Sequence, residues 1–147
     1  MTNYDAVEDF HTLFLSVRHS VQGRQFDRKK RDNPPPISRV QWLIMRIVHD
    51  NRQCTIGDLA ECLGVSASTI SQMIDRLEKV GMVCRVPGQE DARVRLVQLT
   101  DKGTELYDEL SARFIQMLAE PFNTLTSEEQ ETLLRLMKKL ARAFQNR

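Results

Sequence analysis

The chain has 147 residues, of which 41% are hydrophobic and 28% charged, and its formal net charge at pH 7 is +1. This composition is typical of a globular protein with its own core, and the small net charge neither favours nor excludes a nucleic-acid partner. The longest apolar run, Trp42–Met45, is far shorter than the roughly 20 residues of a membrane span, and charged residues interrupt the N-terminal segment too early for a signal peptide. We therefore expect a cytoplasmic protein without a membrane partner.

No catalytic, metal or cofactor site is expected. The cysteines Cys54, Cys62 and Cys84 are an odd number without metal-ligand spacing, and the sequence leaves open whether any of them is redox-active. His11 and His19 lie on different sides of a helix, which argues against a shared metal ion. The sequence has no glycine-rich phosphate loop and no nucleophile with an evident base, so we do not expect an enzyme.

Residues 3–25 are predicted to form a helix with one narrow apolar stripe, whose members recur at alternating steps of three and four residues. The stripe consists of Val7, Phe10, Phe14, Val17 and Val21. A basic stretch at residues 24–31 and the three prolines at residues 34–36 then indicate a loop. This basic loop is either a solvated run or a contact to phosphates that flank a binding site.

The second helix is predicted to start at Ser38, which forms a capping box with Gln41 and precedes a broad apolar face. Thr55 opens a short third helix that stops at Gly64, and Ser66 caps a fourth helix. Because only two residues separate the third helix from the cap of the fourth, the pair is typical of a helix-turn-helix.

Two β-prone runs follow, residues 82–86 and 93–99, and the proline, glycine and aspartate at residues 87–92 predict a hairpin between them. Arg93 and Arg95 should then project from one face of the second strand. Arginine at a hairpin tip can enter the minor groove of DNA, where the negative potential is strong. The alternative is a solvated edge strand without a ligand.

Two further helices are predicted at the C-terminus, starting after Thr100 and after Thr126, with Pro121 ending or bending the first of them. Both carry apolar residues at steps of three and four: Leu106, Leu110, Phe114 and Met117, then Leu133, Met137, Leu140 and Phe144. Together with the first helix they make three narrow stripes without an obvious layer to cover them. We therefore expect the chain to pair with a second copy across a two-fold axis.

The fourth helix has an apolar side and a polar side that suits a DNA major groove, although an ordinary amphipathic surface helix is the alternative. Short hydroxyl side chains near its start allow close approach to DNA, and Gln72 is long enough to pair with an adenine. The residues predicted to contact DNA are Ser66, Ser68, Thr69, Ser71, Gln72 and Arg76 from the helix, and Asp91, Arg93 and Arg95 from the hairpin.

Four stretches of this region carry recognisable patterns. They are Ile37-Ser38-x-x-Gln41-Trp42, then Thr55-Ile56-x-Asp58-Leu59-Ala60, then Ser66–Leu77 with its Asp75-Arg76-Leu77, and lastly Asp91-x-Arg93 followed after five residues by Leu99-Thr100-x-x-Gly103. In this order they resemble the multiple-antibiotic-resistance regulators, the MarR family. The resemblance covers residues 37–103, and the flanking helices match the family in number and order.

The resemblance implies a mainly α fold with a small β-hairpin wing, in which a winged helix-turn-helix lies between N- and C-terminal dimerisation helices. Residues 1–36 would hold the N-terminal dimerisation helix and the basic loop, residues 37–100 the DNA-binding lobe, and residues 101–147 the C-terminal dimerisation helices. It implies a homodimer on a pseudo-palindromic operator in double-stranded DNA, expected to act as a repressor. Arg93 would enter the minor groove, and Asp91 would orient an arginine unless it only forms the turn.

Members of this family often release DNA when a small aromatic or lipophilic acid binds between the dimer region and the winged lobe. The residues that could line such a site here are Phe10, His11, Phe14, Trp42 and Met45, although each could instead belong to the core. The hydroperoxide-sensing branch of the family uses a cysteine in the first helix. This sequence has none there, which argues against that mechanism.

A winged helix that contacts proteins rather than DNA is the alternative function. The weak net positive charge favours it, whereas the hairpin pattern argues against it. The two functions differ in a DNA titration, because phosphate contacts release counterions and so make binding weaken steeply as the salt concentration rises.

Overall fold

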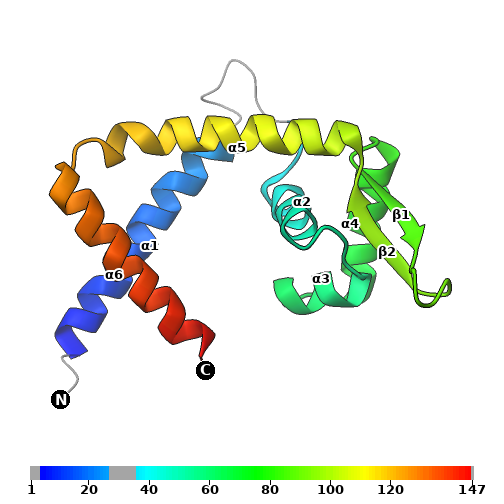
Figure 1. Cartoon of the computed structure of the whole chain (residues 1–147), viewed down its shortest axis with the longest axis horizontal. Coiled ribbons are helices and arrows are strands. Elements are labelled where there is room, and N and C mark those ends of the chain that lie inside the picture. The colour runs from blue at the N-terminus through cyan, green and yellow to red at the C-terminus, as the bar shows by residue number, and fades with distance from the viewer. Residues whose placement is uncertain (1–3, 27–35, 147) are drawn as a thin grey trace. The chain divides into compact units, whose positions relative to one another are not determined.

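The structure is a computed structural model that describes the backbone of residues 4–26 and 36–146 and the side chains of residues 4–21 and 36–146. The described elements are α1 (Tyr4–Phe26), α2 (Arg39–Asn51), α3 (Ile56–Leu63), α4 (Ala67–Lys79), β1 (Val83–Pro87), β2 (Arg95–Leu99), α5 (Asp101–Phe122) and α6 (Ser127–Gln145) (Figure 1). The predicted fold class, mainly α with a small hairpin, is confirmed. The chain packs as two units, Met1–Ser111 and Ala112–Arg147. The side chains of the basic loop at residues 24–31 lie outside the described residues.

Three helices begin with the local signals that mark a helix start. At each of these starts a side-chain oxygen of the cap accepts the backbone N–H three residues later, and the later side chain accepts the backbone N–H of the cap. The pairs are Ser38 with Gln41, Thr55 with Asp58, and Thr126 with Glu129. Losing such a cap typically costs about 1 kcal/mol of stability, so these pairs fix where α2, α3 and α6 begin.

The turn between α3 and α4 depends on Gly64, which has a left-handed backbone with φ 64° and ψ 34°. Residues with a Cβ rarely adopt this conformation, so the glycine ends α3 at low cost. Its N–H donates to the carbonyl oxygens of Ala60 and Glu61, and Ser66 then caps α4. The predicted helix-turn-helix is therefore present.

The core of the first unit lies among α2, α3, α4 and the hairpin. Its fully buried side chains are Ile37, Ile44, Met45, Val48, Leu59, Ile70, Ile74, Leu77, Val83 and Val97. Burying each such side chain contributes about 1.5–3 kcal/mol relative to leaving it in water. The inward side of α4 predicted from the sequence is thus the side that holds this helix in the fold.

The hairpin pairs β1 with β2 in antiparallel register, with Arg85 opposite Val97 and Pro87 opposite Arg95. Cys54, from the connection between α2 and α3, bridges the other edge of β2, because Cys54 and Val97 exchange two backbone hydrogen bonds of 3.0 and 2.7 Å. The segment that precedes α3 is therefore tied to the wing.

The second strand begins at Arg95, two residues later than the sequence predicted, and this corrects the expectation that Arg93 and Arg95 share a strand face. Asp91 explains the difference. Its carboxylate accepts the Arg93 N–H at 2.9 Å, and its carbonyl oxygen accepts the Val94 N–H at 3.1 Å. These bonds keep Arg93 in the loop of the hairpin, because a side chain that bonds nearby backbone competes with the strand ladder.

Tyr107 of α5 stacks on two rings of α2. Its ring centroid lies 4.7 Å from that of Trp42 and 4.1 Å from that of His49, with interplanar angles of 17° and 23°. Aromatic pairs of this kind contribute about 0.5–1.5 kcal/mol beyond the area that they bury. The first part of α5 is therefore fixed to the helix-turn-helix.

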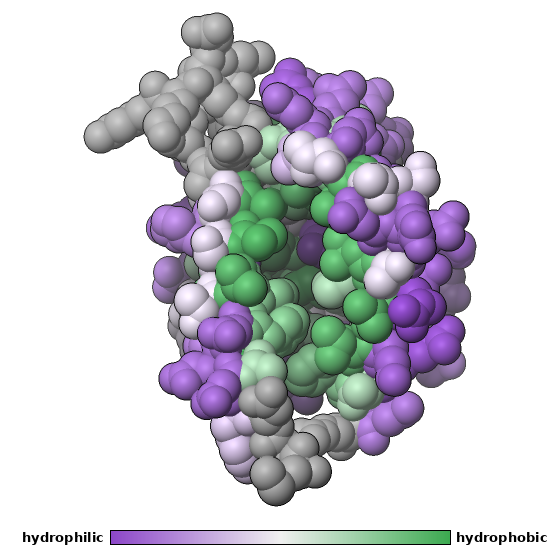
Figure 2. All heavy atoms as spheres, turned by 90° about the vertical axis from the view of Figure 1, so that its left-hand side faces the viewer, coloured by the Kyte–Doolittle hydropathy of each residue, from purple (hydrophilic) through white to green (hydrophobic). Residues whose placement is uncertain are grey.

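Both α1 and α6 expose their apolar stripes. None of the described residues of α6 is buried, and Leu133, Met137, Leu140 and Phe144 are between 40% and 73% exposed. On α1, Val7, Phe10 and Phe14 are also about half exposed, and Figure 2 shows apolar side chains of this kind open at the surface. Among the described residues no helix combines the length and hydropathy that crossing a membrane requires.

Candidate nucleic-acid interface

The outward side of α4 carries the polar side chains that the sequence predicted there. Ile70, Ile74 and Leu77 are buried, whereas Ser68 and Gln72 are exposed. Within residues 4–26 and 36–146, the side chains of Ser68 and Gln72 have no hydrogen-bond partner. Both are therefore available to a ligand outside the protein.

The start of α4 is organised by its cap. The Oγ atom of Ser66 accepts the backbone N–H of Thr69 at 3.2 Å, and the two hydroxyl oxygens lie 2.8 Å apart. Ser71 is half-buried, and Arg76 is exposed without an ion-pair partner in the described part of the chain. Because the N–H groups and the dipole of a helix favour negative charge at its start, this end of α4 can accept a phosphate.

The hairpin loop, residues 88–94, is closed tightly. The Gly88 N–H donates to the Val94 carbonyl oxygen at 2.8 Å, and a Cβ on Gly88 would come within 2.8 Å of the Asp91 carbonyl oxygen. With the Asp91 carboxylate on the Arg93 N–H, the loop leaves Arg93 exposed. Asp91 thus holds the backbone of this arginine rather than its guanidinium.

Arg85 of β1 binds two carboxylates of α4. Its Nη2 lies 2.7 Å from Asp75 Oδ1, its Nη1 lies 2.9 Å from Glu78 Oε1, and its backbone N–H donates to Glu78 Oε2 at 3.2 Å. Burial of the guanidinium disfavours its charge, but the bonds and charges of Asp75 and Glu78 outweigh this and raise the pKa of Arg85 above its ordinary value. We call these three residues the Arg85 clamp.

Sequence reasoning missed the Arg85 clamp. In the sequence, Asp75 falls on the polar side of the fourth helix, which is typical of a solvent-exposed carboxylate, and Arg85 is one residue of the β-prone run 82–86. The available signal was two carboxylates three residues apart on α4, followed by an arginine on the next strand. That signal is weak, because it becomes a contact only when β1 folds back along α4 (Figure 1).

The junction between α4 and β1 is tied to the start of α5. The Thr100 hydroxyl donates to the Gly81 carbonyl oxygen and accepts the Gly103 N–H at 3.0 Å, so Thr100 caps α5 as the sequence predicted. The Lys102 ammonium group donates to the Val80 carbonyl oxygen at 3.0 Å. These contacts fix both the end of α4 and the base of the wing.

The five residues considered for a small-molecule site lie on two helices. Trp42 and Met45 are buried in the core of the first unit, and Trp42 is already stacked on an aromatic ring. Phe10 and Phe14 are exposed on α1, stacked on each other with their centroids 5.9 Å apart, and His11 is exposed beside them. The exposed rings of α1 are therefore the accessible part of this set.

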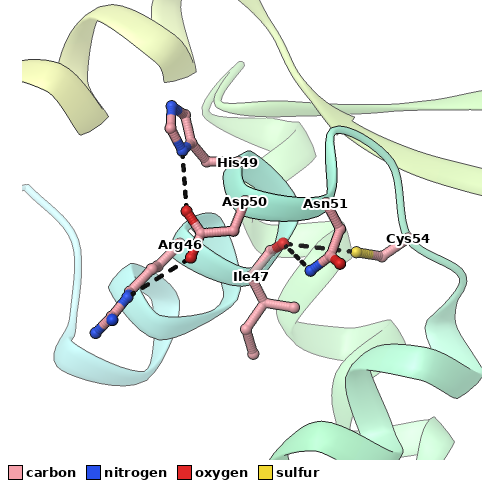
Figure 3. A network of polar contacts seen from close by, with 6 residues as sticks. All are labelled: Arg46, Ile47, His49, Asp50, Asn51 and Cys54. Atoms are coloured by element: carbon pink, nitrogen blue, oxygen red, sulfur yellow. Dashed lines mark hydrogen bonds and ion pairs between the residues drawn. The ribbon is translucent and has the colours of Figure 1, made fainter. Parts of the chain in front are cut away.

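Cys54 lies in the connection that follows α2, beside the Ile47 carbonyl oxygen, around which polar groups gather (Figure 3). That oxygen accepts a bond from Asn51 Nδ2 at 2.8 Å and a weak one from Cys54 Sγ at 3.7 Å. Burial, with added repulsion from Asp58 and Cys62, raises the pKa of the Cys54 thiol, so its thiolate is disfavoured. Cys62 is exposed, and no group of metal-ligating residues occurs in the described part of the chain.

Comparison with known proteins relates this geometry to a family. The family model of the MarR family matches residues 37–94. The HTH-type transcriptional repressor IacR of Pseudomonas putida is 26% identical over 133 residues, which cover 89% of this chain and 77% of the relative. A MarR family protein from Bacillus stearothermophilus shares the fold with a TM-score of 0.86, at 22% identity and 99% coverage of both chains.

A mutant MarR from E. coli, solved in complex with operator DNA, has a TM-score of 0.67 and 25% identity, and the match covers 95% of this chain and 99% of that chain. The matched region begins just before α2 and ends in the hairpin loop, and so contains the helix-turn-helix, the outward side of α4 and Arg93. Residues 37–94 therefore match the model of the MarR family, and the relatives that the chain is similar to are named HTH-type transcriptional regulators.

Proposed function

We propose that this protein is a homodimeric repressor that binds a pseudo-palindromic operator in double-stranded DNA. One observation carries the proposal. The polar side of α4, where Ser68 and Gln72 have no partner among the described residues, adjoins a hairpin whose loop exposes Arg93, and the Arg85 clamp joins the helix to the hairpin. A helix and a wing arranged in this way can occupy a major groove and the neighbouring minor groove. The relatives support the proposal, since one is named a repressor and another was solved on operator DNA.

Each predicted residue has a role in this proposal. Gln72 reads a base edge, because it is exposed, has no partner in the part of the chain that the structure describes, and is long enough for a bidentate contact with adenine. Arg93 enters the minor groove, and Asp91 holds the loop that carries it. The remaining residues, Ser66, Ser68, Thr69, Ser71, Arg76 and Arg95, contact the phosphate backbone and fix the register.

The homodimer in this proposal forms through the helices of residues 1–36 and 101–147, with residues 37–100 as the DNA-binding lobe. The exposed apolar stripes on α1 and α6 support it, because monomers rarely leave such continuous apolar surface in water. A two-fold dimer would place two copies of α4 about one helical turn of DNA apart, which is roughly 10 base pairs. Such a regulator works where the DNA is, in the cytoplasm.

An effector is the last part of the proposal. A small aromatic or lipophilic acid would bind against the exposed rings of Phe10 and Phe14, with His11 beside its carboxylate. Trp42 and Met45 are buried in the core around α2 and would not contact the acid. Binding of the acid would favour a dimer conformation in which the two wings no longer fit the operator.

Selection of bound sequences from random DNA, followed by titration at several salt concentrations, tests the proposed function. We expect a palindromic consensus and an affinity that falls steeply with salt, because several phosphates are neutralised. Repeating the titration with a panel of aromatic acids tests the effector. If no sequence is enriched and no DNA is bound at low salt, the chain is instead a winged helix that contacts proteins.

A further inference from the structure

We propose that Arg85 is a positioning residue for DNA binding: it braces the wing against α4 and neutralises the carboxylates of Asp75 and Glu78 beside the DNA-facing side. It does not itself contact DNA. The inference rests on the proposed function, since it concerns how that interface is kept ready for a duplex.

The bracing follows from the number and direction of the bonds. Arg85 stands in the middle of β1 and reaches two carboxylates one turn apart on α4, while its own backbone N–H is held by Glu78. A planar guanidinium that binds two separate acceptors cannot rotate freely, so it fixes both partners. Because Arg85 lies opposite Val97 in the register, the constraint passes to β2 and so to the loop that carries Arg93.

The neutralisation follows from the exposure of the two acids. The side chains of Asp75 and Glu78 are 63% and 42% exposed, and they flank Arg76 on the helix that is proposed to enter the groove. Two unpaired carboxylates here would repel the phosphate backbone. With Arg85 between them the three groups carry one negative charge instead of two, and Arg76 stays free for DNA.

The same geometry argues against a direct contact from Arg85 to DNA. Its side chain is only 24% exposed, and both terminal nitrogens already bind carboxylates at 2.7 and 2.9 Å. A phosphate could replace these partners only if both bonds broke and the two acids became unpaired. Arg93 and Arg95 are exposed and carry no such bonds in the described residues, so they are the arginines of the wing that can reach DNA.

The test is a mutant cycle on a selected operator fragment. Arg85→Ala is made in the wild-type chain and in the Asp75→Asn/Glu78→Gln chain, and the dissociation constant is measured in all four proteins. We expect Arg85→Ala to weaken binding at least about tenfold in the wild type and less than about threefold in the neutralised background. Two results together would show a direct phosphate contact and overturn the proposal. They are an equal loss of affinity in both backgrounds and a slope of log affinity against log salt concentration that is smaller by about one.

Hydrogen exchange of the free protein tests the brace without DNA. Arg85→Ala should speed exchange of the amides of residues 83–99 while α2 and α3 keep their protection, and Arg85→Lys should restore part of it. Unchanged exchange in the hairpin would overturn the brace. Arg46→Ala is the matched control, because this arginine of α2 is also ion-paired, to Asp50, but lies outside the proposed interface.

Failure of the proposed function gives a different result from failure of this inference. If the wild-type protein binds no DNA, the proposed function fails and the neutralisation fails with it, whereas the exchange experiment still decides whether Arg85 braces the wing. If the wild type binds DNA and footprinting of Arg85→Ala shows unchanged minor-groove protection, only the positioning role is overturned.

Discussion

The carbonyl oxygen of Met82 occupies the space that a Cβ on Gly103 would need. The first turn of α5 therefore lies directly on the backbone that joins α4 to β1, closer than any other residue would allow. This contact explains the glycine at the end of the hairpin pattern in physical terms. It also makes Gly103 part of what fixes the wing relative to α4.

Gly103→Ala should lower the free energy of unfolding by about 1–3 kcal/mol or more, because the added methyl group collides with backbone rather than with a movable side chain. Urea unfolding followed by circular dichroism measures this. Gly57→Ala is the control, since a Cβ there meets only Thr55 Oγ1 at 3.6 Å and alanine favours a helix. Equal stability of the two variants would contradict the proposed packing of α5.

Arg93→Ala should weaken operator binding at least about tenfold, because the loss of one charged contact costs roughly 1.5–3 kcal/mol. Fluorescence anisotropy with a labelled operator measures the affinity, and the circular dichroism spectrum should not change because the side chain is exposed. Asp91→Ala should weaken binding less, since it releases the loop but keeps the arginine. An Arg93→Ala protein with wild-type affinity would remove the wing from the interface.

Gln72→Ala should relax base preference at one position in each half-site by about 1–3 kcal/mol, because the amide is proposed to read a base edge. Repeating the selection from random DNA with this variant gives the preference profile. The overall salt dependence should stay as in the wild type, since no phosphate contact is removed. An unchanged profile would show that Gln72 does not read bases.

Leu140→Glu should convert the dimer to a monomer, because it places a charge in the middle of the exposed apolar stripe of α6. Lys139→Glu, one residue away and off that stripe, is the matched control and should remain dimeric. Light scattering at micromolar protein concentration measures the mass. A wild-type monomer, or a Leu140→Glu dimer, would show that this face of α6 is not the interface.

Cys62 should react with iodoacetamide at pH 8 while Cys54 stays protected, because Cys62 is exposed and burial raises the pKa of Cys54. Peptide mass analysis gives the extent of labelling at each cysteine.

The raised pKa of Cys54 also makes stability depend on pH. In the unfolded chain the Cys54 thiol loses its proton near pH 9.0, whereas in the folded protein it keeps the proton, so the free energy of unfolding should fall as the pH rises through 9.0. Cys54→Ala should remove that part of the decrease.

The elements that the sequence predicted well depend on neighbouring residues. A capping box needs residues three positions apart, such as Thr126 and Glu129, and a left-handed turn needs only Gly64, so both can be read from the chain. The spacing of apolar residues by three and four positions likewise predicted which side of α4 is buried. These predictions are confirmed because local chemistry and the final packing favour the same conformation.

The features that the sequence did not predict depend on contacts between elements. Arg85 meets Asp75 and Glu78 only after β1 has turned back along α4, and nothing within a short window of sequence marks that pairing. The sequence predicts too early a start for β2 because arginine and valine fit a strand. In the structure the Asp91 carboxylate accepts the Arg93 N–H and the Asp91 carbonyl oxygen accepts the Val94 N–H, so the strand starts only at Arg95.

The outer edge of β1 faces away from β2. The Arg85 N–H points towards Glu78 and not towards β2. The backbone positions of β1 that face outward are therefore every second residue, which include Arg85 and Pro87. The Arg85 N–H is occupied by a carboxylate, and Pro87 has no N–H. Cys54 meets the opposite edge of the hairpin at Val97. A strand from another molecule thus finds few free donors to pair with, which protects the wing against edge-to-edge aggregation.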